Sequence, residues 1–533
     1  MKTAHIEMEA WSGTLQQGML SFINYYLSHG PLDKVVAEAK AAVALADEVI
    51  LHRAAERYRQ ELGGILTSTE QLLELPGMSK EVLEQLAHLV SKLDLAKLHA
   101  LVPQTTWNNR VDAYLNGPDC LQLMLEEIHN AKHYIHLSVM LFYNDDAGNR
   151  IAGAMLDALR RGVTVRIMVD YGITAVGYDK SLKVGDFTSI AEQLKQAGGM
   201  LIDTFHACYP KGEWSIKRAE LAEQGVPESS LFLQDYVQEQ MMTGTNMINH
   251  RKFMVIDGIT AVLGSLNIGD QYLFETPIQT SGHEQVDGRK LGVPSKVEQW
   301  HDGCCRIQGA AIQSLNQTFA FQWTVHGGDV YDPCDSFYYP EMDRNLGEEQ
   351  CTLFTSFPGN PVNLIQQYYL SLITYVSDET IIVNPYLIDQ AFWDRLKSLG
   401  EEQARHLTLC NPLLVNDHPT NQTAVRSQMY EPFLKGVSFY DYSQTERFSH
   451  WKITYDHRSD CVFHGSYNIN ERSACHDFEI GVLVKSKPFA NKVKKMIDYD
   501  LSMSRLLTES QEFYQYPALH PSTYLDKWTK FIT

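Results

Sequence analysis

The sequence lacks three features that would place it in a specialised class of protein. None of its nine cysteines forms a C-x-x-C pair, which argues against a zinc ribbon or a disulfide scaffold and favours reduced thiols. No apolar run approaches the roughly 20 residues of a membrane-spanning helix. The opening residues, MKTAHIEMEAWSG, lack the charged-then-apolar layout of a signal peptide. We therefore expect a cytoplasmic or peripheral membrane protein, with export by a signal-independent route left open.

Basic residues are also in short supply. The 533 residues contain 45 lysines and arginines against 65 aspartates and glutamates, for a formal net charge of −20. This balance argues against a non-specific nucleic-acid binder, which usually carries a basic field, although it is compatible with a locally positive pocket. A hydrophobic content of 44% is that of a globular protein, and the length predicts more than one domain.

The texture of the sequence changes along the chain. Residues 1–105 predict a helical region, and residues 67–90 within it resemble a helix-hairpin-helix unit. The hairpin lacks a second glycine, so we favour a helical hairpin that packs on its own domain. From about residue 106, helical and strand patterns alternate, as in an α/β domain. The same plan recurs later, which predicts two similar lobes over residues 106–345 and 346–533.

One polar motif occurs once in each half. The first copy starts with His250-x-Lys252. Asp257 follows after four residues, and after six more comes the sequence G-S-x-N, which contains Ser265 and Asn267. The second copy contains His450, Lys452, Asp456, Ser466 and Asn468 at nearly the same spacing.

Strand geometry gives this spacing a meaning. Side chains two residues apart point to the same face of a strand, so each histidine shares a face with its lysine. A returning strand brings the serine and asparagine beside them. Lysine supplies charge, serine and asparagine supply hydrogen bonds, and histidine supplies a nucleophile or a proton donor, a set that suits a phosphate group.

These paired motifs resemble those of the phospholipase D superfamily, whose signature is two H-x-K-x4-D-x6-G-S-x-N (HKD) motifs. The segments LDALRRGVTVRIMVDYG, VNPYLID, NINERS and the tryptophan-containing segment at 300–329 look like the bacterial cardiolipin synthase and phosphatidyltransferase group. The resemblance covers roughly residues 110–490. It implies two lobes, each a mixed sheet flanked by helices, with one active site at their interface.

The resemblance also implies a mechanism. One histidine would attack phosphorus to form a phosphohistidine intermediate, and the other would protonate the leaving alcohol. Family precedent favours His250 as the nucleophile. Lys252, Lys452, Asn267 and Asn468 would hold the phosphate oxygens, and Asp257, Ser265 and Ser466 would support the motifs. No metal or other cofactor is expected, because two lysines supply the positive field.

Two carboxylates are predicted to orient the histidines. Glu479 fits the glutamate that the family places after the second motif, and the alignment of WHDGCCRI with DFEIGVLV puts Asp302 at the equivalent position. We therefore expect Asp302 to orient His250. The greater distance of Asp302 from its motif predicts a long surface loop over residues 275–297.

The second motif departs from the family pattern. Asp456 lies one position early, and His457 stands where the aspartate is expected. A shorter first strand and a longer turn would accommodate this change, so we interpret Asp456 as the counterpart of Asp257. Asn470 stands where the lipid synthases often have aspartate, which loosens the assignment to a particular lipid.

Three functional hypotheses follow. The leading one is an enzyme that hydrolyses glycerophospholipids or transfers their phosphatidyl group to an alcohol, with a phospholipid substrate, peripheral membrane contact and no nucleic-acid partner. The second is a nuclease or phosphodiesterase of the same superfamily, which the hairpin at 67–90 favours and the net charge opposes. The third is an inactive scaffold, for which the displaced Asp456 is the only argument.

Overall fold

A computed structural model describes most of the chain beyond residue 103. The described residues are 104–171, 173–174, 187–205, 214–226, 231, 248–273, 300–333, 335–341, 346–358, 363–413, 416–417, 419–442 and 447–508. The predicted helical region therefore lies outside them, apart from Gln104 and Thr105, which are in a strand rather than a helix. The predicted loop at 275–297 also lies outside them.

The first lobe alternates strands and helices as the sequence predicts. Its elements are β1 (Gln104–Leu115), α8 (Gly117–Asn130), β2 (Tyr134–Val139), α9 (Asp146–Arg160), β3 (Thr164–Val169), α11 (Thr188–Gln196), β4 (Met200–Asp203), α12 (Trp214–Glu223), β5 (Ile248–Asn249), β6 (Phe253–Ile256), β7 (Thr260–Gly264), β8 (Gly303–Gln308) and α14 (Ala311–Val325).

The second lobe repeats this order with small additions. Its elements are β9 (Glu349–Ser356), α15 (Leu364–Thr374), β10 (Thr380–Val383), α16 (Gln390–Lys397), α17 (Glu401–Ala404), β11 (Leu407–Asn411), α18 (Pro419–Lys435), β12 (Ser438–Asp441), β13 (Ile453–Asp456), β14 (Cys461–Gly465), α19 (Glu471–Cys475), β15 (Asp477–Lys485), α20 (Lys487–Ser502) and β16 (Arg505–Leu506).

The strands of both lobes form one continuous mixed sheet. The first lobe contributes the order β4-β3-β2-β6-β7-β8-β1, and the second continues it as β9-β15-β14-β13-β10-β11-β12, with β16 at the far edge. The strands from β4 to β1 thus mirror those from β9 to β12, whereas β16 and β5, which pairs with β15 off this order, have no counterpart among the described strands. The counterparts β1 and β9 pair antiparallel at the centre, where they join the lobes. The predicted two-lobed α/β fold is confirmed.

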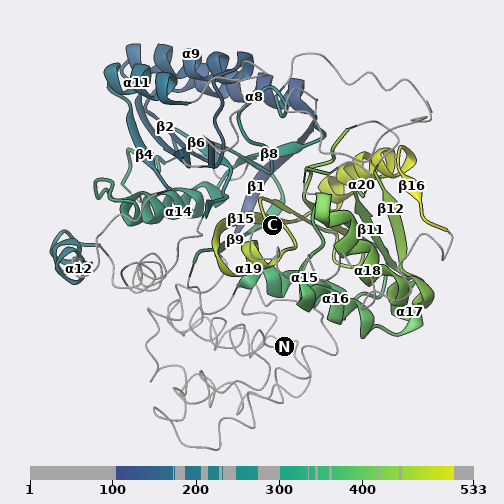
Figure 1. The fold of residues 1–533 in the computed structure, drawn as a ribbon. Helices are drawn as coiled ribbons and strands as arrows, with labels where there is room; N and C mark the ends of the chain where they lie inside the picture. Colours follow the sequence, from purple (N-terminus) through teal and green to yellow (C-terminus); the bar gives the residue numbers. More distant parts are fainter. Residues whose placement is uncertain are drawn as a thin grey trace, which may run out of the picture.

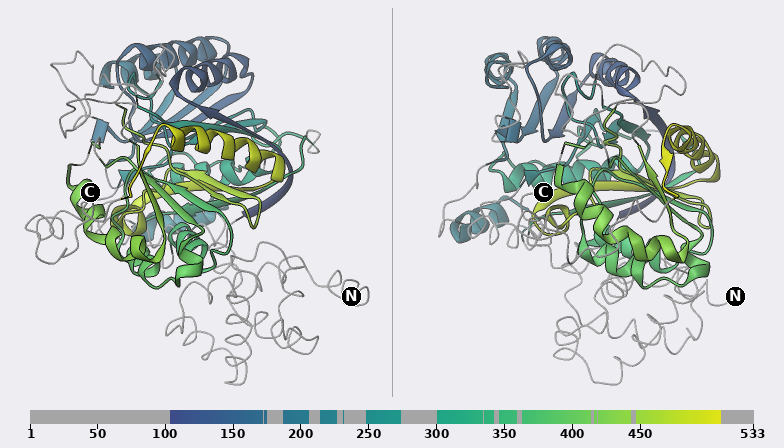
Figure 2. Two further views of the ribbon diagram at one scale, coloured as in Figure 1. Left: turned by 90° about the vertical axis from the view of Figure 1, so that its right-hand side faces the viewer. Right: turned by 45° about the vertical axis from the view of Figure 1, so that its right-hand side comes forward.

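Helices cover the sheet on both faces. In the first lobe, α8, α9 and α11 lie on one face and α14 on the other, and in the second lobe α15, α16 and α18 lie on the face opposite α20 (Figures 1 and 2). Side-chain oxygens fix several of the helix starts. Asp145 accepts a hydrogen bond from Gly148 N in α9, and Asn363 accepts from Ile365 N and Gln366 N in α15.

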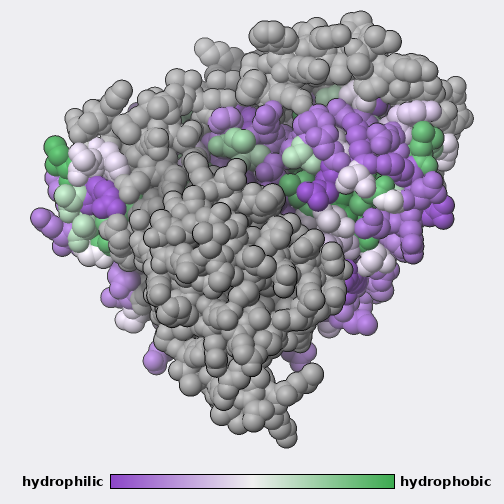
Figure 3. All heavy atoms as spheres, turned by 90° about the horizontal axis from the view of Figure 1, so that it is seen from below, coloured by the Kyte–Doolittle hydropathy of each residue, from purple (hydrophilic) through white to green (hydrophobic). Residues whose placement is uncertain are grey.

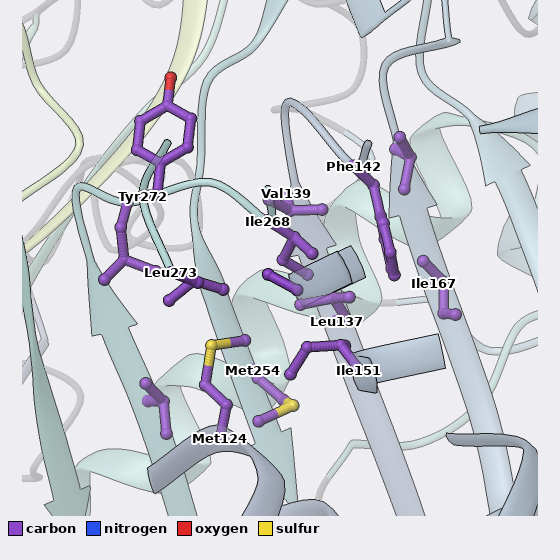
Figure 4. Packing of buried hydrophobic residues seen from close by; sticks show 14 of the residues in the cluster. Met124, Leu137, Val139, Phe142, Ile151, Ile167, Met254, Ile268, Tyr272 and Leu273 are labelled. Atoms are coloured by element: carbon purple, nitrogen blue, oxygen red, sulfur yellow. The ribbon is translucent and has the colours of Figure 1, made fainter. Parts of the chain in front are cut away.

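Two hydrophobic cores lie on opposite faces of the first lobe's part of the sheet. Met124, Leu137, Ile151 and Met254 pack between the sheet and the helices α8 and α9 (Figure 4). On the opposite face, a single cluster contains residues of both lobes, among them Val111 of β1 and Leu353 of β9. This shared core fixes the relative position of the two lobes and of the polar residues at their boundary.

Candidate active site

Each motif histidine lies on a short extended segment that precedes the motif hairpin. In the first lobe, His250 follows β5, and the backbone nitrogen of Gly264 at the end of β7 donates to Lys252 O at 3.1 Å. This bond brings the two ends of the motif together. A Cβ atom on Gly264 would lie 2.5 Å from Gly303 O, which explains the glycine of G-S-x-N.

The histidine segments cross between the lobes. β5 pairs with the start of β15 in the second lobe, and His250 N donates to Phe478 O at 3.0 Å. The second lobe reciprocates, because His450 N donates to His301 O at 2.8 Å. The backbone thus places each histidine against the carboxylate-bearing strand of the opposite lobe.

This crossing corrects the predicted orientation of the histidines. Asp302 and Glu479 do occupy equivalent positions, but His250 Nδ1 lies 2.9 Å from Glu479 Oε1, and His450 Nδ1 lies 2.7 Å from Asp302 Oδ2. The predicted pairing of Asp302 with His250 is wrong. Its error was the assumption that a carboxylate serves the histidine of its own lobe, whereas β5 and residue 449 pair with the other lobe.

The serines connect each carboxylate back to its own motif. Ser265 Oγ donates to Asp302, and Ser466 Oγ donates to Glu479. Ser473 Oγ, in α19, also donates to Glu479 Oε1 at 2.5 Å. Each buried carboxylate therefore bridges a serine of its own lobe and a histidine of the other, which fixes the ring orientation of that histidine.

Both motif lysines are buried beside the histidines. Lys252 Nζ donates to His250 O at 2.7 Å, and Lys452 Nζ donates to His450 O at 2.9 Å. Lys452 Nζ also lies 3.0 Å from His450 Nε2. Burial lowers the pKa of Lys252 to about 7 and that of Lys452 to about 8. An anion that enters the site would favour the protonated lysines.

Both motif asparagines carry unsatisfied polar atoms. Asn267 Oδ1 accepts from Leu141 N at 3.2 Å, but its side-chain nitrogen is buried with no hydrogen-bond partner among the described residues. The same holds for Asn468 Oδ1. Buried polar groups normally find a partner, so these atoms are places where a polar ligand would bind.

The histidines share one electrostatic environment. Burial, and then the charge of Lys252, lower the pKa of His250 well below its usual value, and the charge of His450 lowers it further. Burial and Lys452 lower the pKa of His450 to about 4, against the opposing charges of Asp302 and Asp417. Both rings are therefore neutral at pH 7 in the ligand-free protein, and an anionic phosphate would raise both values.

The two carboxylates differ in their protonation. Burial raises the pKa of Asp302, but His450 and Lys452 outweigh it, so the pKa stays below its usual value. Burial raises the pKa of Glu479 to about 7, although Lys252 and the serine hydroxyls act against it. Asp302 is thus an anion beside His450, whereas Glu479 titrates near neutrality beside His250.

The aspartate of the first motif has a structural contact set. Asp257 accepts backbone hydrogen bonds from Lys132 at 2.7 Å and from His133 and Tyr134 at 2.8 Å each. It adopts a positive φ of 53° in the turn between β6 and β7. Asp257 therefore fixes the start of β2 and makes no contact with the motif histidine.

The interpretation of Asp456 as its counterpart is wrong. Asp257 N bonds to Tyr134 O, and it is His457 N that makes the equivalent bond, to Glu379 O. The first strand is not shorter, since β6 and β13 both contain four residues. Only the turn is longer, so Asp456 remains at the end of its strand, where it accepts from Ser459 Oγ. Asp378 Oδ1 accepts from Glu379 N at 2.7 Å in place of the missing carboxylate.

Sequence reasoning missed several residues that shape the site. Arg251 is buried between the motif residues, and it donates to Glu479 O at 3.1 Å and Ser356 O at 2.9 Å. Its position between His250 and Lys252 was the available signal. Tyr272, Trp300 and Phe448 lie around His450. Trp300 starts a segment that resembles the family, but the grouping of the three rings could not be predicted, because they come from three separate segments.

The described residues contain no group of three His, Cys, Asp or Glu side chains placed to hold a metal ion. Over the same residues, no helix combines the length and apolar character needed to cross a membrane. On the face shown in Figure 3, the described side chains are mainly hydrophilic, with hydrophobic ones in small separate patches.

Comparison with known proteins gives consistent matches. The family described as "Cardiolipin synthase, PLD-like domain" matches residues 124–277 and 369–501, more than half of the chain. Cardiolipin synthase 1 of Staphylococcus aureus (strain MRSA252) is 28% identical over 407 residues, which are 76% of this chain and 70% of the relative. The cardiolipin synthase of Oceanobacillus iheyensis is 27% identical over 449 residues, which are 84% and 80% of the two chains.

The fold also has a solved counterpart. The crystal structure of phosphatidylserine synthase from Haemophilus influenzae superposes with a TM-score of 0.55 at 13% sequence identity. The match covers 81% of this chain and 98% of that chain. At this identity the likeness concerns the two-lobed architecture alone.

Proposed function

Because the chain belongs to the cardiolipin synthase family of phospholipase D-like proteins, we propose that it transfers a phosphatidyl group from a glycerophospholipid to an alcohol, with water as an alternative acceptor. The observation that carries the proposal is the pair of buried histidines, each oriented through Nδ1 by a carboxylate of the opposite lobe. The two buried motif lysines together provide positive charge that would bind a phosphodiester.

The reaction proceeds in two displacements at phosphorus. In the first, His250 Nε2 attacks phosphorus while the bond to the head-group oxygen breaks, and His450 gives that oxygen a proton. In the second, His450 takes a proton from the acceptor hydroxyl, whose oxygen attacks phosphorus as the bond to His250 breaks. The phosphohistidine between the two steps divides one difficult displacement into two easier ones.

The charges around the two histidines support this division of roles. A nucleophile must be neutral, and the pKa of His250 lies well below its usual value because burial is reinforced by Lys252. A proton donor must hold its proton when substrate is bound, and the charges of Asp302 and Asp417 both favour protonated His450. His250 is therefore the better nucleophile and His450 the better acid.

The remaining motif residues stabilise the charge that develops on phosphorus. Lys252, Lys452 and the asparagines Asn267 and Asn468 would bind the non-bridging oxygens, whose charge increases in the transition state. Donors fixed in a dry site do this without reorganising, which makes them more effective than water. The lipid substrate implies contact with a membrane surface, and the protein would make it as a peripheral enzyme.

The proposal is tested with labelled phosphatidylglycerol, phosphatidylethanolamine and single-stranded DNA, each incubated with the wild type and a His250→Ala variant. We expect cardiolipin with free glycerol, or phosphatidic acid, only from the wild type. DNA cleavage with untouched lipid would establish the nuclease instead. No turnover of any of the three would favour the inactive scaffold. The complete set of histidines, lysines and carboxylates argues against that hypothesis.

A further inference from the structure

The two histidines have different neighbours at equivalent positions. Around His450, the ring centroids of Trp300, Tyr272 and Phe448 lie at 5.4, 5.6 and 5.8 Å. Around His250, the equivalent positions hold Asp477, Ser473 and Ile248. The ring of Tyr272 points away from the first lobe's core, whose other labelled residues pack together (Figure 4). The second lobe's histidine thus has an aromatic wall that the first lobe's histidine lacks.

A carboxylate lies beside this wall. Asp417 is partly exposed, and its Oδ1 accepts a hydrogen bond of 2.5 Å from the hydroxyl of buried Tyr386. The Tyr386 ring in turn lies 6.3 Å from the Phe448 ring. The charge of Asp417 favours the protonated forms of both His450 and Lys452, so it lies within electrostatic reach of the reacting groups.

A negative charge at this place opposes the binding of an anionic phosphodiester. The mechanism does not need it, because Asp302 already orients His450. A carboxylate at the edge of such a site becomes favourable when the substrate brings hydrogen-bond donors to it. These donors must belong to the alcohol part of the substrate, because phosphate oxygens only accept hydrogen bonds.

Two polar atoms, one in the wall and one on the residue that precedes Tyr272, favour a hydroxyl-rich alcohol over an ammonium group. Trp300 Nε1, a donor in the wall, and Oε1 of Gln271, an acceptor whose backbone oxygen accepts from Trp300 N at 2.7 Å, are both buried without hydrogen-bond partners among the described residues. A hydroxyl group can accept from the first and donate to the second, whereas an ammonium group only donates. The rings also pack edge to face on one another, as Tyr272 does on Trp300, rather than offering open faces to a cation.

We propose that Asp417, held by Tyr386, binds the glycerol hydroxyls of the leaving and entering head groups beside His450. This proposal rests on the proposed function and adds to it a residue that selects the alcohol. Leaving and entering alcohols use one subsite, because the second displacement retraces the first in reverse.

The test uses the partition of the phosphoenzyme between two acceptors. The full-length protein acts on phosphatidylglycerol vesicles in buffer that contains ethanol, and cardiolipin and phosphatidylethanol are measured together. Both products arise from the same intermediate, so their ratio does not depend on the amount of folded enzyme or on the rate of the first step. Ethanol has no second hydroxyl for Asp417. We expect the ratio of cardiolipin to phosphatidylethanol to fall about tenfold in Asp417→Asn, through loss of a charge-assisted hydrogen bond.

Two further variants sharpen the result. Tyr386→Phe keeps the packing but removes the hydroxyl that holds Asp417, and the ratio should fall by a smaller factor. Asp394→Asn removes a negative charge from α16, in the same lobe, at an exposed residue that bonds to Gln390, and the ratio should equal that of the wild type.

The outcomes separate the two proposals. An unchanged ratio in Asp417→Asn, or an equal fall in Asp394→Asn, would overturn the alcohol subsite and leave the proposed function standing. A wild type that makes neither product from phosphatidylglycerol, and releases no phosphatidic acid from it or from phosphatidylethanolamine, would overturn both.

Discussion

The two lobes share their strand order, but the surroundings of their motif histidines differ. Each supplies one histidine, one lysine and one carboxylate, yet the carboxylate of each lobe orients the histidine of the other. His250 lies near the buried ion pair of Arg472 with Asp477, whereas His450 lies within aromatic rings. The difference teaches that two copies of one plan can hold the same motif groups in unlike surroundings, which in the proposed mechanism separate the nucleophile from the acid.

Removal of either histidine should have the largest effect. We expect His250→Ala and His450→Ala to lower phosphatidylglycerol turnover by at least about 10³-fold, since each histidine takes part in both displacements of the proposed mechanism. The two variants should differ on a phosphatidyl ester of p-nitrophenol, a leaving group that departs without a proton. Stopped-flow absorbance should show a burst of p-nitrophenol in His450→Ala and none in His250→Ala. The opposite pattern would exchange the roles.

The crossed carboxylates give the next largest effect. Glu479→Gln and Asp302→Asn should each slow phosphatidylglycerol turnover by about 10²-fold, because a histidine without its carboxylate loses orientation. Crossing predicts that Glu479→Gln slows the p-nitrophenol burst, through His250, much more than Asp302→Asn does. If Asp302→Asn were the variant with the slow burst, the contacts between lobes would not be those of the active enzyme.

The turns of the two motifs differ in stability rather than in chemistry. Asp257 is buried and satisfies three backbone N–H groups, so Asp257→Ala should lower the free energy of unfolding by about 3 kcal/mol. His457 occupies the equivalent position in the second lobe but is exposed, and its pair with Asp378 is open to solvent. His457→Ala should therefore leave the urea midpoint close to that of the wild type. Equal losses in both variants would contradict the distinction.

The lysines should produce the smallest effect, a pH dependence of anion binding. Burial lowers the pKa of Lys252 to about 7 and that of Lys452 to about 8, so their protons leave as the pH rises through these values, where an exposed lysine stays charged. Inhibition by tungstate should weaken about tenfold between about pH 7 and pH 9. Lys452→Arg, which retains its charge, should flatten the upper part of this profile. Constant inhibition across the range would show that the lysines stay protonated.

Local patterns were enough to predict the two-lobed fold, and they marked the motif residues that the structure brings together. Asp302 and Glu479 could be matched because both enter an apolar strand at the same place in the repeat. The crossing could not be predicted, since it depends on the pairing of β5 with β15, which brings together segments over 200 residues apart in the chain. The assignment of Asp456 was wrong because it rested on the presence of a carboxylate near the expected position. The position that corresponds to Asp257 is set by the register of β13 against β10, which the sequence does not reveal.

The pairing of β1 with β9 has a consequence for any attempt to study the lobes apart. Each of these strands is interior to the joined sheet, but each would become an edge strand in an isolated lobe. A long edge strand with free N–H and C=O groups is a template for association with other chains. Each separated lobe would therefore lack half of the proposed catalytic residues and would also expose an unpaired strand edge. Expression of single lobes should yield aggregates or strand-paired dimers rather than monomers.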